Sequence, residues 1–338
     1  MTIREIAAAA GVSRGTVDRV VNNRGKVRPE IAERVRRCMD ELGYTPNKAG
    51  KALVARKNPI KIGCFLPSLG NPFFDEVIRG FRAAEAELRD FGLGLLLREA
   101  RGYQAEEHIA ALRGLVEEGA SAICAATLDV PAMRGCVNAI AAGGVPVIAL
   151  NNELPGTKRL CYVGGDFQRG GRTAAKLLTL LCREPPELLI VTGSLQVKGH
   201  NDRVTGLLDS LKELGVSYNL AALRESLDDD DLAYDVTLRA LGERPEINCV
   251  YIAAGGVEGV CRAIRDSKAR ALKVISFDDP EGTRALLRSG EIDCTICQEP
   301  FRQGYQAVSG MFHYLLGGKK TAPPDCLTET VIKVKENI

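Results

Sequence analysis

From residue 60 onward, short apolar runs alternate with amphipathic stretches that are long enough to form helices. This alternation predicts parallel strands joined by helices, in a doubly wound α/β arrangement. Two units of similar length follow one another and divide near Leu160. The strand candidates are IKIGCFL, LGLLLR, SAICAA, VPVIAL, LCYVG, ELLIVTG, NCVYIAA, KVISF and IDCTIC. No Walker sequence occurs, and no G-x-G-x-x-G follows a strand, so we expect no cofactor.

The first 58 residues, here called the head, differ from the rest of the chain in charge. They hold 13 of the 45 Lys and Arg residues but only 6 of the 43 Asp and Glu residues. The head therefore carries a net charge of +7 and the remaining residues, the body, carry −5. A basic head on a mildly acidic body indicates a segment that meets a polyanion. Apolar residues at helical spacing argue against a merely solvated tail.

Residues 1–45 have the pattern of a small all-α domain. Thr2 and Glu5 form a capping box, which predicts a first helix that stops at Gly11. Ser13 caps a second helix that runs to about Asn22, and Pro29 suits the first position of a third helix. Two short helices joined by a tight turn that contains glycine make a helix-turn-helix unit.

The start of the second helix has the residues needed for entry into the major groove of DNA. Arg14 can donate two hydrogen bonds to a guanine, and Thr16 can contact a base edge or a phosphate. Gly15 has no side chain and lets the backbone approach the DNA. Solvated helix charge is the alternative explanation for Arg14 and Arg19. The residues of this domain that we expect to contact double-stranded DNA are Thr2, Ser13, Arg14, Gly15, Thr16, Arg19 and Asn22.

The stretches GVSRGTVDRVVNN and LGYTPNKAGKAL resemble the DNA-binding head and hinge of the LacI/GalR family of bacterial transcription regulators. The usual family pattern is VSxxTVSRVLN followed by YxPNxxARxL. This sequence departs from the pattern at Asp18, Arg28 and Gly50, where the family usually has Ser, Ser and Ala. The departures concern the operator sequence rather than the DNA-binding role.

The same resemblance implies that residues 46–59 form a hinge helix and linker. In the family, the hinge becomes helical only on operator DNA, and a leucine from each subunit wedges into the minor groove. Leu53 matches that leucine, and Lys51 is expected to contact DNA beside it. Such a wedge unstacks a base step at a cost of a few kcal/mol and lets the bent duplex meet more protein. An ordinary linker position is the alternative for Leu53.

The body resembles the periplasmic-binding-protein type 1 domain, and most closely its sugar-binding branch typified by ribose-binding proteins. The motifs that carry this resemblance are SLGNPFFDEVIRGF, VPVIALNNEL, HNDRVTGL, VISFDDP and CTICQEPFRQGY. In that fold, the chain crosses three times between two lobes that close on a ligand. The resemblance implies an N-terminal lobe of residues 60–160 plus 291–320 and a C-terminal lobe of residues 161–290 plus 321–338.

Nine effector-binding residues follow from this resemblance, motif by motif. In the family, an asparagine bonds a hydroxyl and phenylalanines stack on the sugar. An aspartate takes two vicinal hydroxyls in a charge-assisted fork. Gly255 and Gly256 stand where the family has an Asn-Asp pair, which predicts a wider corner there. The matching residues are Asn71, Phe73, Phe74, Asn151, Asn152, Arg203, Gly255, Asp278 and Gln298.

Alternative roles exist for several of these side chains. Arg203 and Asp278 could form a structural ion pair, and each phenylalanine could simply pack in the core. We expect His200 to lie in a surface loop rather than in the cleft. The run Asp228–Asp231 suits a helix N-terminus better than a calcium site, because the D-x-D-x-D-G loop pattern is absent.

Eleven cysteines in a chain without an export signal indicate reduced core residues of a cytoplasmic protein. Cys294 and Cys297 have C-x-x-C spacing, but in a strand they point to opposite faces, so no metal site is expected. Arg4 and Glu5 interrupt any signal-peptide core, and no run is long enough to span a membrane.

The sequence predicts a transcriptional regulator, with repression as its expected action, that binds a pseudo-palindromic operator as a homodimer. We expect its effector to be a sugar, cyclitol, polyol or sugar acid. The C-terminal ETVIKVKENI has no heptad tail, which favours dimers over dimers of dimers. A solute-binding component of sugar uptake would leave the head unexplained. An enzyme is not expected, because Asp278 has no partner acid and no nucleophile–base pair is evident.

Overall fold

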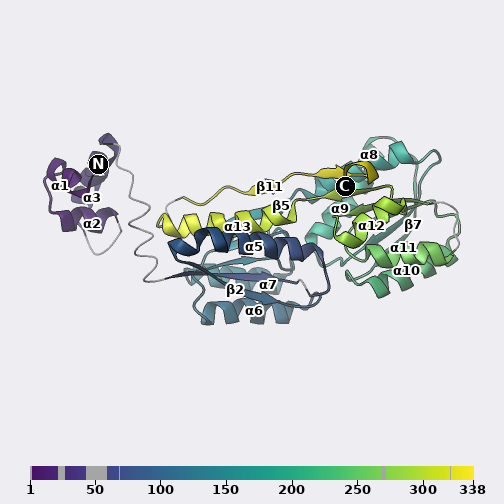
Figure 1. The fold of residues 1–338 in the computed structure, drawn as a ribbon, viewed down its shortest axis with the longest axis horizontal. Helices are drawn as coiled ribbons and strands as arrows, with labels where there is room; N and C mark the ends of the chain where they lie inside the picture. Colours follow the sequence, from purple (N-terminus) through teal and green to yellow (C-terminus); the bar gives the residue numbers. More distant parts are fainter. Residues whose placement is uncertain (1, 22–26, 43–58, 68, 268–271, 320) are drawn as a thin grey trace.

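A computed structural model describes residues 2–21, 27–42, 59–67, 69–267, 272–319 and 321–338 (Figure 1). In the head, three helices surround one small apolar core: α1 (Ile3–Ala9), α2 (Arg14–Val21) and α3 (Pro29–Glu41). The predicted capping box starts α1, because the Thr2 hydroxyl accepts from the Glu5 N–H while the Glu5 carboxylate accepts from the Thr2 N–H. Gly11, at φ +61°, makes the turn that follows. The predicted helix-turn-helix is confirmed.

The first lobe of the body is a six-stranded sheet covered on both faces. Its strand order is β11-β5-β4-β3-β1-β2, and every pair in it is parallel. Helices α5 and α13 pack on one face, and α6 and α7 pack on the other (Figure 1). The strands are β1 (Ile60–Leu66), β2 (Leu93–Glu99), β3 (Ala122–Ala125), β4 (Val147–Leu150), β5 (Cys161–Gly165) and β11 (Cys326–Thr328). The helices are α5 (Phe73–Leu88), the short η1 (Arg89–Phe91), α6 (Ala105–Glu117), α7 (Pro131–Ala142) and α13 (Pro300–Leu316).

The second lobe repeats this plan. Its strand order is β12-β10-β9-β8-β6-β7, and only β12 runs antiparallel to its neighbour. Helices α8 and α9 cover one face, while α10, α11 and α12 cover the other. The strands are β6 (Glu187–Thr192), β7 (Asn219–Glu225), β8 (Cys249–Ile252), β9 (Lys273–Phe277), β10 (Cys294–Cys297) and β12 (Val331–Lys333). The helices are α8 (Phe167–Leu181), α9 (Lys198–Glu213), α10 (Asp230–Glu243), α11 (Val257–Ser267), α12 (Glu281–Ser289) and η2 (Lys335–Asn337).

The two sheets correct the predicted division of the body at three strands. Strand β5 pairs with β4 and therefore belongs to the first lobe, although residues 161–290 were assigned to the second. Strand β10 pairs with β9, so residues 294–297 belong to the second lobe rather than to a 291–320 segment of the first. Strand β11 pairs with β5 and joins the first lobe. The chain crosses between the lobes after β5, after β10 and after β11.

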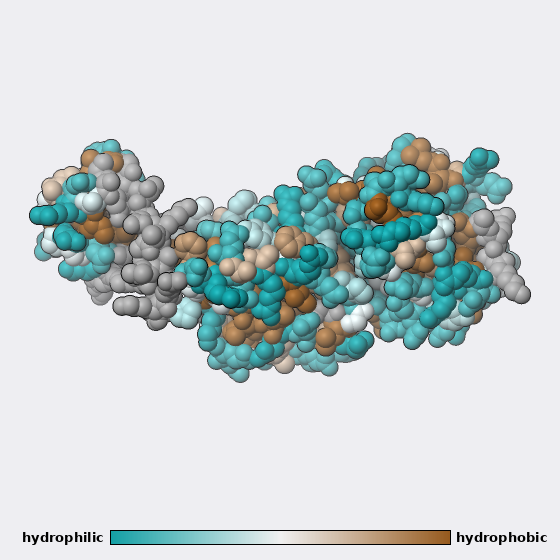
Figure 2. All heavy atoms as spheres, viewed as in Figure 1, coloured by the Kyte–Doolittle hydropathy of each residue, from teal (hydrophilic) through white to brown (hydrophobic). Residues whose placement is uncertain are grey.

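Most of the visible surface of the body is hydrophilic, with hydrophobic residues reaching it in patches (Figure 2). Among the described residues, no helix is long and apolar enough to cross a bilayer.

Each lobe contains a helix pair in which a glycine on each helix touches the backbone of the other. Gly80 of α5 and Gly304 of α13 face each other's backbones, and a Cβ on either would lie closer than 3.0 Å to a carbonyl oxygen of the other helix. Gly171 of α8 and Gly206 of α9 make the equivalent contact in the second lobe. Because real Cβ atoms do not approach that closely, the helices can keep this spacing only without side chains there.

This contact gives a matched pair of substitutions on α13. Gly304→Ala should lower the free energy of unfolding by about 2 kcal/mol, because the added methyl overpacks the helix crossing. Gly310→Ala should instead raise it by up to about 1 kcal/mol, since no atom lies within 4 Å of its Cβ position and alanine favours the helix. Urea denaturation of both variants measures the difference. Equal effects would contradict the crossing argument.

Candidate functional site

Four of the predicted DNA-contacting residues, Ser13 to Thr16, lie at the N-terminus of α2, and Arg19 lies further along the same helix. Arg14, Gly15 and Arg19 are exposed, while Val17 and Val20 of the same helix are buried in the head core. The Ser13 hydroxyl accepts a hydrogen bond from the Thr16 N–H (3.1 Å), which caps the helix as expected. Side chains of α2 are thus divided between the core and an outward face that carries the arginines.

The other residues predicted to bind DNA are placed less fully. Thr2 is exposed at the start of α1, where its side chain caps that helix. Asn22, Lys51 and Leu53 lie outside the described residues, as does nearly all of the hinge segment 46–59. The wedge role of Leu53 stays a prediction.

A cleft of about 740 Å³, part of it open to solvent, lies between the lobes at the carboxyl ends of the strands. This is where parallel α/β sheets bind ligands. Residues of both lobes line it, and all nine predicted effector-binding residues are among them: Asn71, Phe73, Phe74, Asn151, Asn152, Arg203, Gly255, Asp278 and Gln298. The motif positions thus converge, although their role in binding stays a prediction.

Three cleft residues other than glycine have left-handed backbones. Asn151 follows β4 at φ +60°, Asp278 follows β9 at φ +60°, and Asp228 lies in the loop before α10 at φ +57°. Such conformations cost of order 1–3 kcal/mol each and are commonest at functional sites. Each one turns a polar side chain into the space between the sheets.

Arg203 is the central cation of the cleft. Its guanidinium lies between two rings, 4.6 Å from the centroid of Phe167 and 4.1 Å from that of Phe277. Its Nη1 donates to the Ala253 carbonyl oxygen (2.9 Å), and its Nε is buried without a hydrogen-bond partner. Stacking and hydrogen bonding therefore fix the direction of the side chain and leave one donor unused.

Asp278 faces Arg203 in an incomplete ion pair. Its Oδ2 lies 4.0 Å from Nη2 of Arg203 and accepts a hydrogen bond from Nε2 of Gln298 (3.0 Å). Its Oδ1 is buried and has no partner. Burial raises the pKa of Asp278 to about 6, even though the charge of Arg203 and the Gln298 bond oppose this shift. A structural ion pair would satisfy both groups, whereas this one leaves a buried acceptor and a buried donor without partners.

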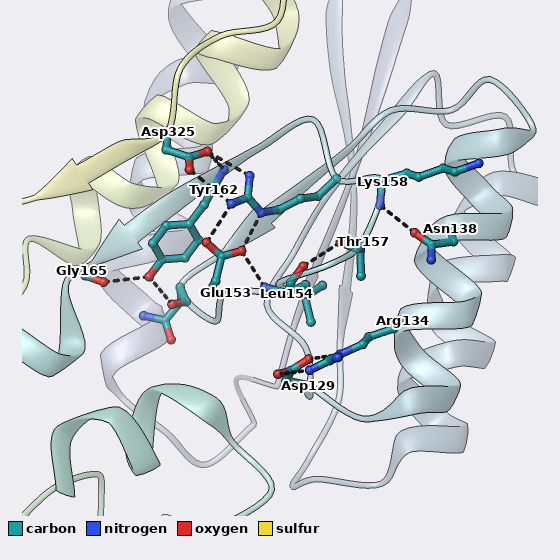
Figure 3. A network of polar contacts seen from close by, with 12 residues as sticks. Asp129, Arg134, Asn138, Glu153, Leu154, Thr157, Lys158, Tyr162, Gly165 and Asp325 are labelled. Carbon is teal, nitrogen blue, oxygen red and sulfur yellow. Dashed lines mark hydrogen bonds and ion pairs between the residues drawn. The ribbon is translucent and has the colours of Figure 1, made fainter. Parts of the chain in front are cut away.

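Asn151 is held by contacts from both sides. Its Nδ2 donates to Oε1 of Gln303 on α13 (3.1 Å), and its carbonyl oxygen accepts from the Tyr162 hydroxyl (2.7 Å). A charged network supports this end of the sheet (Figure 3). In it, Arg159 joins Glu153 (2.6 Å) to Asp325 (2.9 Å). Asp325 also accepts from the Tyr162 N–H (2.7 Å), which ties the segment before β11 to β5.

The phenylalanines that begin α5 serve two purposes. Phe73 and Phe74 are 9% and 5% exposed, belong to the core of the first lobe and also line the cleft. Their rings pack edge to face, with 5.1 Å between the ring centroids. Before them, Oδ1 of Asn71 accepts from the Phe73 N–H (3.1 Å), so the Asn71 amide nitrogen is left to point across the cleft.

Sequence reasoning missed Asp228, which is the partner of that amide. Its carboxylate accepts from Nδ2 of Asn71 (3.3 Å), from the Tyr103 hydroxyl and from the Gly255 N–H (2.8 Å). Asp228 therefore fills the corner beside Gly255, and the predicted widening there is wrong. The next residue behaves as expected, because the Asp229 side chain caps α10 through Asp231 and Leu232 N–H groups.

The expectation for His200 is also wrong, because it lies on α9 and lines the cleft. Its Nδ1 accepts from the Ser194 N–H (3.0 Å), which leaves Nε2 to carry the proton. Burial lowers the pKa of His200, so the ring is neutral near pH 7. The sequence could have indicated that His200 lines the cleft, because it lies three residues before Arg203 and therefore on the same side of a helix.

Cysteine and carboxylate clusters suggest no further site. Cys294 and Cys297 are both buried in β10. Within the described ranges, no group of three or more His, Cys, Asp or Glu residues could hold a metal ion.

Two family models match the chain. Residues 2–47 match the bacterial regulatory proteins of the lacI family, and residues 62–320 match a periplasmic binding protein domain. The chain belongs to the LacI family. The lacI match covers most of the head, where the structure shows a helix-turn-helix. The periplasmic-binding-protein match covers most of the body, where the structure shows two lobes.

Several known proteins are similar to this LacI-family chain. The ribose operon repressor of Bacillus subtilis (strain 168) is 29% identical over 65% of this chain and 63% of its own length. The regulator CelR of Thermobifida fusca is 26% identical over 99% of this chain and 98% of its own. The solved structure of GanP, a glucose-galactose binding protein from Geobacillus stearothermophilus, is 25% identical with a TM-score of 0.76. It covers 83% of this chain and 99% of that one.

The raised pKa of Asp278 predicts a stability that depends on pH. Between its usual pKa of 3.8 and about 6, the folded protein holds a proton that the unfolded chain has lost. The free energy of unfolding should therefore fall as pH rises through this range and stay low above it. Asp278→Asn should remove that loss and stabilise the ligand-free protein at pH 7–8, by on the order of 2 kcal/mol.

Denaturant unfolding between pH 4 and pH 8 checks this expectation. The difference between Asp278→Asn and the parent should vanish near pH 4. Asp235→Asn, which changes an exposed residue of α10, serves as the control and should show no such dependence. A constant difference at all pH values would show that Asp278 is not destabilised by its charge.

Proposed function

We propose that this chain is a ligand-responsive transcriptional regulator whose effector is a small polyhydroxylated molecule. The observation that carries the proposal is the combination, in one chain, of an arginine-bearing helix-turn-helix and a cleft whose buried Asp278 Oδ1 has no partner. The names of the similar repressors and of the sugar-binding GanP support this assignment. A solute-binding role alone would leave the head without a use.

The head would supply DNA recognition. The outward face of α2 places Arg14 and Arg19 where a helix enters the major groove. Arg19 also donates from Nε to the Gly15 carbonyl oxygen (3.1 Å), which leaves its two Nη groups for DNA. One head offers few contacts, so we propose a cytoplasmic homodimer that reads two half-sites about one helical turn apart.

The cleft would supply control. Hydroxyl groups of an effector can donate to Asp278 Oδ1 and accept from Arg203 Nε, which would satisfy both unused groups. Asn71 and Asn151 come from the first lobe, and Arg203 and Asp278 come from the second. An effector that bonds both sets favours one arrangement of the lobes, and only such differential affinity can change DNA binding.

DNA recognition can be tested without a known operator. Selection from a random duplex library should enrich a pseudo-palindromic sequence whose affinity falls steeply with salt. Arg14→Ala should weaken binding to that sequence by about 10-fold or more, because a bidentate base contact is lost. Arg172→Ala, an exposed arginine on α8, is the control and should bind normally. Failure to enrich any sequence would contradict the DNA-binding assignment, and a sedimentation mass of four chains would contradict the dimer.

Effector binding can be tested by thermal shift against sugars, polyols, cyclitols, sugar acids and nucleobases. A ligand at about 100 times its dissociation constant should add roughly 2.7 kcal/mol to the stability of the body. An external dye is needed because the chain has no Trp. Asp278→Ala should abolish the shift and the effect of the ligand on DNA binding, while DNA binding itself persists. A normal response in that variant would show that the ligand binds elsewhere.

A further inference from the structure

The charges that line the cleft do not balance. Of the described residues in its lining, four carry carboxylates and one carries a guanidinium. His200 adds no charge near neutral pH, because burial lowers its pKa and its Nδ1 accepts a backbone N–H. The carboxylates are those of Asp228, Asp230, Glu258 and Asp278, and the guanidinium is that of Arg203.

The single guanidinium is already engaged. Arg203 is stacked between two phenylalanines, donates to the Ala253 carbonyl oxygen and lies 4.0 Å from the Asp278 carboxylate. An anionic group on a ligand would have to compete with Asp278 for this cation. The cleft is therefore poorly suited to a carboxylate or a phosphate.

Asp228 is a cleft carboxylate whose hydrogen-bond partners within the described residues include no cation. All of its hydrogen-bond donors are uncharged: the Gly255 N–H, the Asn71 amide and the Tyr103 hydroxyl. Among the described residues, no Lys, Arg or His forms an ion pair with it. A partly buried charge in such surroundings is stabilised strongly when an opposite charge joins it.

The backbone around Asp228 makes room for this carboxylate. A Cβ on Gly193, at the end of β6, would lie closer than 3.0 Å to Asp228 Oδ1. A Cβ on Gly255, after β8, would lie 3.0 Å from the Asp228 Cβ. Two glycines at neighbouring strand ends thus accommodate one charged side chain, which also reaches across to Asn71 and Tyr103 of the first lobe.

A second cavity borders the cleft and is also lined by several carboxylates. It shares Phe73, Glu258 and Asp278 with the cleft and has further carboxylates on both lobes. Its one guanidinium, that of Arg284, is paired with Asp279 (2.9 Å). Cations outside this lining pair with three of the carboxylates: Arg79 with Glu76, Lys333 with Asp279 and Arg288 with Glu281. The cleft carboxylates Asp228, Asp230 and Glu258 therefore carry the charge argument, and this cavity adds little to it. The added carboxylates are Asp75, Glu76, Asp279 and Glu281.

We propose that the effector carries a protonated amine, as in an amino sugar or an aminocyclitol, and that Asp228 pairs with this amine. The inference rests on the proposed function, since it assumes a polyhydroxylated effector in the cleft. Hydroxyl groups meet Asp278, Arg203 and Gln298, and the ammonium group meets Asp228. Sugar acids are thereby excluded from the proposed effector class.

The test compares forms of the same sugar that differ in one substituent: an ammonium group in place of the C2 hydroxyl, or a carboxylate in place of the C6 hydroxymethyl group. The probes are the 2-amino, parent and uronic acid forms of glucose, galactose and mannose, together with an aminocyclitol and inositol. Thermal shift and calorimetry at pH 7 and low salt give the affinities. In at least one series, the amine should bind about 10-fold or more tightly than the parent, since a bond to a charged group contributes about 1.5–3 kcal/mol. The acid should give no shift.

Two variants assign the effect to one carboxylate. Asp228→Asn keeps the shape and the bond from Gly255 but removes the charge, so it should reduce amine affinity about 10-fold and leave the parent's affinity nearly unchanged. Asp235→Asn removes a charge from an exposed position on α10 and should change neither. Unfolding of the ligand-free Asp228→Asn variant checks that it folds.

The outcomes separate this inference from the proposed function. If a parent sugar or an acid binds most tightly, the effector is polyhydroxylated but the amine assignment is wrong. If Asp228→Asn and Asp235→Asn weaken the amine equally, Asp228 is not its partner and the inference also fails. If no polyhydroxylated probe binds, the proposed effector class itself fails.

Discussion

The buried guanidinium of Arg203 is the interaction on which the cleft depends. Taking an arginine out of water costs several kcal/mol unless stacking, hydrogen bonds and an opposite charge compensate. Here Phe167 and Phe277 supply the stacking, and the Ala253 carbonyl supplies an acceptor. The Arg203 backbone is fixed as well, because its carbonyl oxygen accepts from the Tyr251 hydroxyl (3.3 Å). Helices α8 and α9 and strands β8 and β9 therefore meet at one residue, which gives the second lobe a rigid wall.

Much of the fold follows from the sequence because its signals are local. Each of the nine predicted strands overlaps an observed one, since buried parallel strands are apolar on both faces and stand out from their neighbours. Strand β7 was missed because it is an edge strand with mixed exposure, NLAALRE. Strands β11 and β12 have three residues each, too few to form an apolar run. Lobe boundaries depend on pairing between distant segments, which no local pattern encodes.

The candidate site, like the fold, was predictable from the sequence only in part. Motif positions such as Asn71, Arg203 and Asp278 were predictable because each lies in a stretch that resembles a motif of the periplasmic-binding-protein fold. Asp228 was not, since four consecutive aspartates read equally well as helix caps. Only the three-dimensional structure shows that Asp229 caps α10 while Asp228, with its left-handed backbone, turns the opposite way. The absence of a side chain at Gly255 likewise suggested space, whereas a residue 27 positions earlier fills it.

The three crossings between the lobes have a mechanical consequence. They follow β5, β10 and β11; β11 lies beside β5 in one sheet, and β10 lies beside β12 in the other. The crossings are also tied together, because the Glu329 N–H donates to the Glu299 carboxylate (2.9 Å). Three crossing segments that lie side by side resist twisting and shear of one lobe against the other, but they permit rotation of the lobes about one axis. The edge strands β2 and β7 lie farthest from that axis in their sheets. The body is therefore a lever in which a small turn at the hinge becomes a larger displacement at the outer edges.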